Sequence, residues 1–244
     1  MPIPPKPNSD ELAKRYGLEP VPESVQRLTQ LVARRDSWGE DIATVINQDQ
    51  MLTGRLLSAA NPKAQKEADY KFTTTQECMS RVGMNWVLLL AMVTPLLSAV
   101  HKTFSTMLSV ELQQTRLGLM PQFKEEHFLG EVAFTGKASG VVHLRMLRTT
   151  ALVIATRMLG LQPEEITSDD EIHDVIGELS NIIAGNLRSN LSDAHLDCKL
   201  SPPKISCTPD FAIFKPSGNV AERYGFRAQE IDLFVDISVN PKSV

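Results

Sequence analysis

The chain has 244 residues, of which 42% are hydrophobic and 22% charged, and its formal net charge is −4. This length and composition are typical of one large or two small globular domains. The mildly acidic balance lacks the basic patch that marks nucleic-acid-binding proteins, so nucleic acid is not an expected partner. Cys78, Cys198 and Cys207 have no C-x-x-C spacing, which indicates ordinary thiols and neither a disulfide framework nor a zinc site.

Two segments of the sequence indicate where in the cell the protein is located. Residues 1–7 are rich in proline and lack the charged and apolar regions of a signal peptide. The longest apolar run, from Val87 to Val100, is too short to span a bilayer and is interrupted by Thr94 and Pro95. We therefore expect a cytoplasmic protein without membrane insertion.

Helical patterns fill the first part of the chain. Pro22 suits the first turn of a helix that carries apolar residues at helical spacing up to Val32. Further helices are predicted over residues 40–46, 51–60, 75–81 and 84–93, with Asp49 as an N-terminal cap and Gly83 between the last two. No strand pattern interrupts them, which predicts an all-helical module.

This helical part resembles a known signalling domain. The stretches 45–61 and 81–86 are similar to the N-terminal part of the HDOD output domain of bacterial signalling proteins. The resemblance covers about residues 18–92, which is shorter than the usual HDOD domain and indicates a truncated copy.

A new amphipathic helix is predicted next, with Thr94 as its N-terminal cap and Pro95 at its first helical position. We place the domain boundary there. The expected organisation is a partial HDOD-like helical module over residues 1–92, with a Pro-rich N-terminus, and a second domain over residues 93–244.

The second half mixes strands and helices. Residues 128–134 and 140–146 alternate with period two around a glycine-containing turn, which predicts a hairpin. A helix is expected over residues 148–159, stopped by Gly160, and strands at 204–207, 211–214 and 231–239. This pattern predicts an α+β fold whose largely antiparallel sheet has one buried face, with helices packed on that side.

The helix after residue 168 is the most informative element. Ser168 and Glu171 form a predicted capping box at its start. Its apolar residues fall on one stripe when placed at 100° intervals: Ile172, Val175, Ile176, Leu179, Ile182, Ile183 and Leu187. Asp174, Glu178, Asn181 and Gly185 share another face, where Glu178 and Asn181 are neighbours one turn apart.

These residues resemble the signature of the CheX and CheC type of chemotaxis phosphatases. Asp174, Glu178, Asn181 and, downstream, Pro203 follow the family's order and approximate spacing, and the resemblance extends over about residues 95–244, including the hairpin. It implies a phosphatase that hydrolyses the aspartyl phosphate of a CheY-like response regulator in bacterial two-component or chemotaxis signalling.

The resemblance also implies roles for individual residues. The Asn181 carboxamide is the candidate to orient the attacking water, and Glu178 would pair with a lysine of the regulator. Asp174 would support Glu178 or the start of the helix, and Gly185 would allow close approach of the partner. The chain would need no cofactor or metal of its own because the phosphorylated partner brings Mg²⁺, and a homodimer joined through the sheets is expected.

Three other interpretations stay open at this point. Glu178 and Asn181 are compatible with an ordinary solvated helix face, and the same fold is compatible with a non-catalytic dimeric adaptor that docks a regulator. His173 and Asp174 spell the doublet of metal-dependent HD phosphohydrolases. The remaining histidines do not have ligand-like spacing, and His143 is expected to point outward from a strand, which disfavours a metal site.

Overall fold

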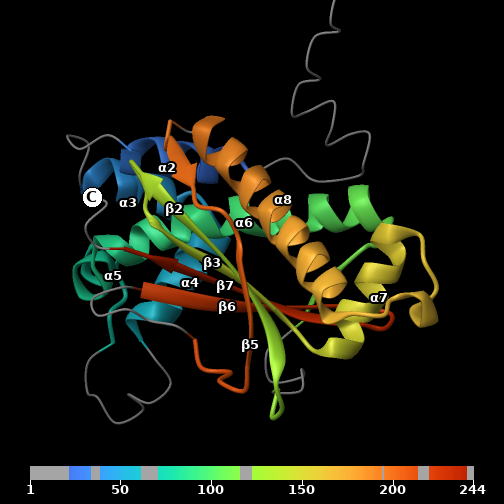
Figure 1. The fold of residues 1–244 in the computed structure, drawn as a ribbon. Coiled ribbons are helices and arrows are strands. Elements are labelled where there is room, and N and C mark those ends of the chain that lie inside the picture. Colours follow the sequence, from blue (N-terminus) through green and yellow to red (C-terminus); the bar gives the residue numbers. More distant parts are fainter. Residues whose placement is uncertain are drawn as a thin grey trace, which may run out of the picture.

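The computed structural model describes residues 22–33, 39–61, 71–115, 123–193, 195–213 and 220–240. The first part contains the helices α2 (Glu23–Ala33), α3 (Glu40–Asn47), α4 (Gln50–Ala60), α5 (Thr75–Val82) and α6 (Met84–Leu108). The second part contains β1 (Gln113–Thr115), β2 (His127–Gly136), β3 (Gly140–Met146), α7 (Arg148–Leu159), a 3-10 turn (Pro163–Glu165), α8 (Asp169–Asp193), β4 (Cys198–Leu200), β5 (Lys204–Thr208), β6 (Val220–Ala228) and β7 (Ile231–Val239) (Figure 1). The predicted α+β class, with a helical part before an antiparallel sheet, is confirmed.

The helices of the first part begin and end where local chemistry predicts. The Asp49 carboxylate accepts hydrogen bonds from the backbone amides of Met51 and Leu52, at 2.8 and 3.1 Å, and so caps α4 as expected. Gly83 has a φ of +79° between α5 and α6, a conformation that glycine adopts at little cost. The apolar sides of these helices form a shared core with the rest of the protein.

The predicted helix start at Thr94 and Pro95 is wrong, because α6 runs unbroken through Pro95. A proline has no N–H, so the carbonyl of Ala91 loses its usual donor one turn earlier. The Thr29 hydroxyl of α2 donates to the Val25 carbonyl of its own helix at 2.7 Å and shares that proton, at 3.3 Å, with the Ala91 carbonyl. Asn190 of α8 donates to the carbonyl of Pro95 itself at 3.0 Å. Polar side chains from α2 and α8 thus lie against the backbone of α6 at the proline, and α6 continues through it.

The expected boundary between residues 92 and 93 therefore falls inside α6. Helix α6 contacts α2, α4 and α5, which precede the expected boundary in the chain. It also contacts α7, α8, β6 and β7, which follow it. One buried apolar cluster also spans both parts. By length and composition α6 could cross a membrane, but 72% of its most apolar window is buried inside the protein, as in a core helix.

The strands form one antiparallel sheet in the order β1-β6-β7-β3-β2-β4, and β5 also pairs with β2. The predicted hairpin is confirmed as β2 and β3, with Phe128 opposite Met146 and Phe134 opposite Gly140. Strands β4 and β5 follow each other along β2 and are separated by residues 201–203. The two prolines of that break lie at the sheet edge, where a missing N–H is tolerated.

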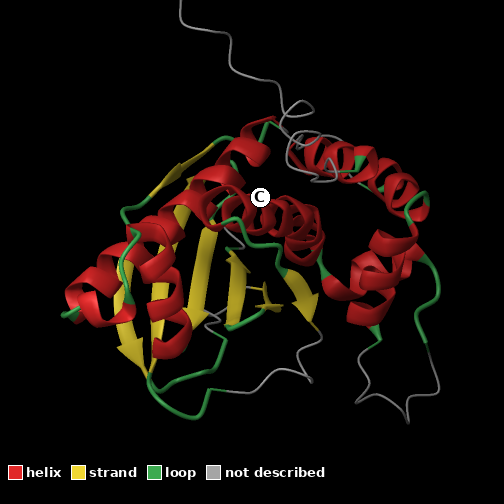
Figure 2. Cartoon of the chain, turned by 90° about the vertical axis from the view of Figure 1, so that its right-hand side faces the viewer, coloured by secondary structure: helices red, strands yellow, loops and turns green. Residues whose placement is uncertain are grey.

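Helices α6, α7 and α8 all contact the sheet, and they gather over one of its faces (Figure 2). The other face was predicted to be open, and this expectation is wrong. In β7 every residue except Asp232 is buried, including Phe234, Asp236 and Ser238, which point away from the helices. Residues 211–213, expected to begin a strand, form an irregular segment, and residue 214 lies outside the described part of the chain.

Buried charges hold that segment on the second face of the sheet. The Asp236 carboxylate is 1% exposed and pairs with Arg145 at 3.0 Å and with Arg223 at 2.6 Å. Arg145 also donates to the carbonyls of Asp210 and Ala212, and Arg223 donates to that of Phe211. These charged residues alternate with apolar ones along the strands, so the sequence pattern alone suggested a solvated face.

Two histidines belong to this network. His127 Nε2 lies 3.0 Å from Nη1 of Arg145, which always donates, so His127 accepts through an unprotonated nitrogen. Burial lowers the pKa of His127, and the positive charge of Arg145 lowers it further. His143, expected to point into solvent, is only 2% exposed and contacts Glu131 at 3.0 Å. Burial lowers the pKa of His143 as well.

Candidate functional site

The candidate site lies on α8, whose start is fixed by the predicted capping box. The Glu171 carboxylate accepts from the backbone amide of Ser168 at 3.1 Å, and the Ser168 hydroxyl accepts from the amide of Glu171 at 3.4 Å. Asp169 and Asp170 lie in the first turn, where negative charge suits the positive end of the helix dipole. The capping box therefore fixes the start of α8 at Asp169, more than two turns before Glu178.

The two faces of α8 divide as the sequence predicts. The apolar stripe is buried except for Ile182, which is half-buried, and Asp174, Glu178 and Asn181 are exposed. Within the described residues, none of these three side chains has a hydrogen bond or an ion pair to another part of the chain. A Cβ built on Gly185 would meet nothing within 4 Å, so this glycine leaves open surface one turn beyond Asn181. The structure brings all four candidate residues onto one accessible face.

Pro203 lies beside this face. A Cβ built on Gly177 would be 3.9 Å from Cγ of Pro203 and 3.7 Å from Cγ1 of Ile205. Pro203 therefore borders α8 at Gly177, one turn before Asn181, although 26 residues separate Pro203 from Gly177 in the sequence. The break between β4 and β5 is what places the proline at this position.

The height of α8 above the sheet depends on a glycine of β2. A Cβ on Gly130 would overlap the Ser180 hydroxyl oxygen, and it would lie 3.3 Å from both Ser180 Cβ and Ile176 Cγ2. A side chain at this position would require the Ser180 hydroxyl to rotate and α8 to shift by a few tenths of an ångström. Ser180 precedes Asn181, so the contact sets how far the candidate residues project from the protein. Gly130 was not among the predicted site residues; a glycine within an alternating strand was the available signal.

Helix α8 is also joined to α6 by two amide side chains. Asn186 donates to the Thr103 hydroxyl at 3.0 Å, and Asn190 donates to the carbonyl of Pro95. Both asparagines follow the candidate residues on the same helix. These contacts could not be predicted from local patterns because their partners lie more than 80 residues away in the chain.

The structure gives the metal-site interpretation no support. Among the described residues, no group of three His, Cys, Asp or Glu side chains is placed to hold a metal ion. His173 packs edge-on against Phe128, with ring centroids 5.4 Å apart, and its Nε2 lies 3.9 Å from Sγ of Cys207. The three cysteines are free thiols, and burial raises the pKa of each.

Comparison with protein families confirms both resemblances. Residues 128–226 match the family described as "Chemotaxis phosphatase CheX", and this match contains the hairpin, α8 and Pro203. Residues 18–116 match the HDOD domain. The HDOD match thus runs past residue 92, through the whole of α6 and β1. A comparison with curated proteins gives no match.

Solved structures agree with this fold. A CheC-like superfamily protein from Shewanella sp. PV-4 is 22% identical, with a TM-score of 0.53, and the similarity covers 61% of this chain and 97% of that one. The chemotaxis protein CheX from Vibrio vulnificus is 20% identical, covers 61% and 96%, and has a TM-score of 0.52. CheX from Desulfovibrio desulfuricans is 18% identical, covers 61% and 99%, and has a TM-score of 0.52. The chain therefore has a CheX-like fold.

Proposed function

We propose that this protein is a phosphatase that hydrolyses the aspartyl phosphate of a CheY-like response regulator in bacterial chemotaxis or two-component signalling. The observation that carries the proposal is the joint exposure of Glu178 and Asn181, one turn apart on α8, inside the segment that matches the CheX family. Surface residues that nothing in the fold requires are the ones that a partner can use.

The chemistry asks for positioning more than for covalent work. Hydrolysis of an acyl phosphate needs a water in line with the scissile bond, and charge around the phosphoryl group must be balanced. The Asn181 carboxamide accepts a hydrogen bond from the water through its oxygen and donates through its nitrogen, and it stays neutral beside the phosphate. Mg²⁺ on the regulator balances the charge, so this chain supplies no metal ligand.

Glu178 serves docking in this proposal. Its carboxylate is one turn from Asn181 and pairs with a lysine of the regulator, which places Asn181 over the phosphoryl group. Asp174, one turn earlier, adds negative charge on the same face, and the open surface at Gly185 admits the partner's backbone. A desolvated pair of this kind sets register and responds to salt.

The proposal extends to the setting of the reaction. The protein acts in the cytoplasm, where response regulators are phosphorylated, and it works as a homodimer joined through its sheets. Sedimentation of the purified protein at micromolar concentration tests the dimer, and a monomer at all concentrations would contradict it.

The decay of a panel of phosphorylated regulators, with and without this protein, tests the activity. We expect one or more regulators to lose phosphate faster, and Glu178→Gln to weaken binding and reduce its salt dependence. Asp193→Asn is the matched control, because it removes an exposed carboxylate at the far end of α8, about 22 Å along the helix. Binding of a regulator without faster decay would instead support the non-catalytic adaptor.

A further inference from the structure

The exposed face of α8 continues beyond the candidate residues to an arginine. Arg188 lies two turns after Asn181 on the same helix, and the two side chains are almost in line along the axis. The residues between them are buried or half-buried, and Arg188 itself is exposed. A Cβ on Gly185, midway between the two, would meet nothing within 4 Å, so the surface that joins them is open. The face proposed for docking therefore carries a cation near its C-terminal end.

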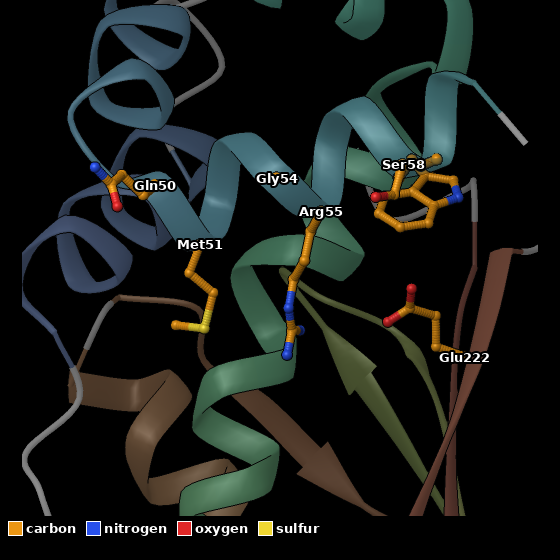
Figure 3. Close-up of a pocket in the computed structure, with 8 residues that line it drawn as sticks. Gln50, Met51, Gly54, Arg55, Ser58 and Glu222 are labelled. Carbon is orange, nitrogen blue, oxygen red and sulfur yellow. The ribbon is translucent and has the colours of Figure 1, made fainter. Parts of the chain in front are cut away.

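Arg188 differs from the other arginines of the segment that matches CheX, because its guanidinium forms no hydrogen bond or ion pair with any described residue. The others are held in the fold: Arg145 and Arg223 pair with Asp236, Arg148 pairs with Asp169, and Arg157 donates to Gln229. Arg55 of the helical part is held as well. Figure 3 shows it reaching from α4 toward the side where Glu222 lies, and its Nη1 donates to the Tyr224 hydroxyl at 3.4 Å. The Arg188 guanidinium is thus available to a partner.

The charges on this face have opposite signs at its two ends. Glu178 is a carboxylate, and Arg188 follows it about 15 Å further along the helix axis. Burial raises the pKa of the Cys198 thiol on β4, and the charge of Arg188 opposes this rise, which places the guanidinium on the β4 side of α8. A neutral thiol does not compensate a cation, so the positive charge remains open to an anion.

We propose that Arg188 binds a carboxylate on the surface of the phosphorylated response regulator and so fixes the direction in which α8 lies across it, a role that rests on the proposed function. An ion pair at Glu178 alone defines one point of contact and permits two opposite directions of the helix. A second contact of opposite sign removes this ambiguity, because a reversed helix would bring each charge against a like charge.

The geometry assigns this contact to docking and not to the chemical step. Arg188 lies about 10 Å along the axis from Asn181, so a carboxylate paired with it lies to one side of the phosphoryl group. A guanidinium can hold a carboxylate through two parallel hydrogen bonds, which adds direction to the contact. The partner that fits is a regulator with a lysine on one side of its aspartyl phosphate and an acidic side chain on the other.

Binding of the full chain to a cognate regulator, activated with beryllofluoride and Mg²⁺, tests this contact. Arg188→Gln should weaken binding about threefold and Arg188→Glu about tenfold at low salt, and both differences should shrink as salt is added. The rate of phosphate loss at saturating phosphorylated regulator should stay within about twofold of that with the unaltered protein. Arg27→Glu makes the same change of charge at an exposed position of α2 and is the matched control.

Charge reversal on the regulator tests the partner side. Each acidic surface residue within about 15 Å of the phosphorylated aspartate is replaced by lysine, and one of these changes should restore binding to Arg188→Glu. No such position, or equal binding by Arg188→Glu and Arg27→Glu, would overturn the contact while the phosphatase proposal stands. A slower rate at saturation with unchanged binding would also overturn it, by placing Arg188 at the phosphoryl group. If the unaltered protein binds no regulator, both proposals fail.

Discussion

The close approach of Gly130 to Ser180 predicts a loss of stability when Gly130 is replaced by alanine. An added methyl group at Gly130 would overlap the Ser180 hydroxyl and press on Ile176, in a core where overpacking costs about 1–3 kcal/mol. Replacing a glycine by alanine returns about 0.4–1 kcal/mol through the unfolded chain. We therefore expect Gly130→Ala to lower the free energy of unfolding by about 1–2 kcal/mol, or the thermal midpoint by roughly 3–6 °C.

Ser180→Ala should reverse much of this loss. The Ser180 hydroxyl is buried and has no hydrogen-bond partner among the described residues, so its removal should itself stabilise the protein by about 1 kcal/mol. In the Ser180→Ala background the alanine at 130 meets only contacts of 3.3 Å, which the helix can relieve by a small shift. The cost of Gly130→Ala should then fall below about 1 kcal/mol.

Thermal and denaturant unfolding of the four proteins in this cycle measure the coupling. Gly185→Ala is the matched control, since its methyl group enters open space on an exposed helix and should stabilise by up to about 1 kcal/mol. The same loss for Gly130→Ala in both backgrounds, or no loss at all, would refute the inference that this contact sets the height of α8.

Three further predictions concern the core and the titrating groups. His127 has a lowered folded-state pKa, so its contribution to stability is present above about pH 6.5 and is lost as pH falls, by up to about 1.4 kcal/mol per pH unit; His127→Gln should flatten this dependence in urea titrations, and an unchanged slope would contradict it. Thr29→Val removes a buried hydroxyl that donates to the Val25 carbonyl at 2.7 Å and lies 3.3 Å from the Ala91 carbonyl, and it should cost about 1–3 kcal/mol, less when Pro95→Ala gives Ala91 back its helix amide; equal costs in both backgrounds would show that the contact with Ala91 contributes nothing. A chain limited to residues 93–244 should fail to fold, because the cut divides α6 and uncovers its core face; a soluble, cooperatively melting fragment would restore the division expected from the sequence.

Local signals predicted most of the helices and the hairpin. The caps at Asp49 and Ser168 and the stop at Gly160 depend on neighbours within one turn, so they can be read from the chain alone. The strands β1, β4 and β6 were not predicted. β1 and β4 are three residues long, which is too short to show an alternating pattern, and β6 mixes arginine and glutamate with its apolar residues.

The predictions that were wrong depended on contacts between residues that are distant in the sequence. Pro95 by itself predicts a helix start, whereas in the fold it lies inside α6, packed against polar side chains of α2 and α8. The charged residues Asp236 and Arg145 are typical of a solvated face, but they form a buried ion pair between β7 and β3. For the candidate site, spacing placed Asp174, Glu178, Asn181 and Gly185 on one face, whereas the supporting contact at Gly130 depends on how α8 lies on the sheet.

In the proposed function, Asn181 orients the water that hydrolyses the regulator's aspartyl phosphate. Its direct test is the rate of phosphate loss from a cognate phosphorylated regulator in the presence of Asn181→Ala, with regulator binding and thermal midpoint measured on the same protein. We predict that the acceleration by the unaltered protein falls by roughly 100-fold, while binding and the midpoint stay unchanged. Acceleration by Asn181→Ala close to that of the unaltered protein would contradict the water-orienting role of Asn181.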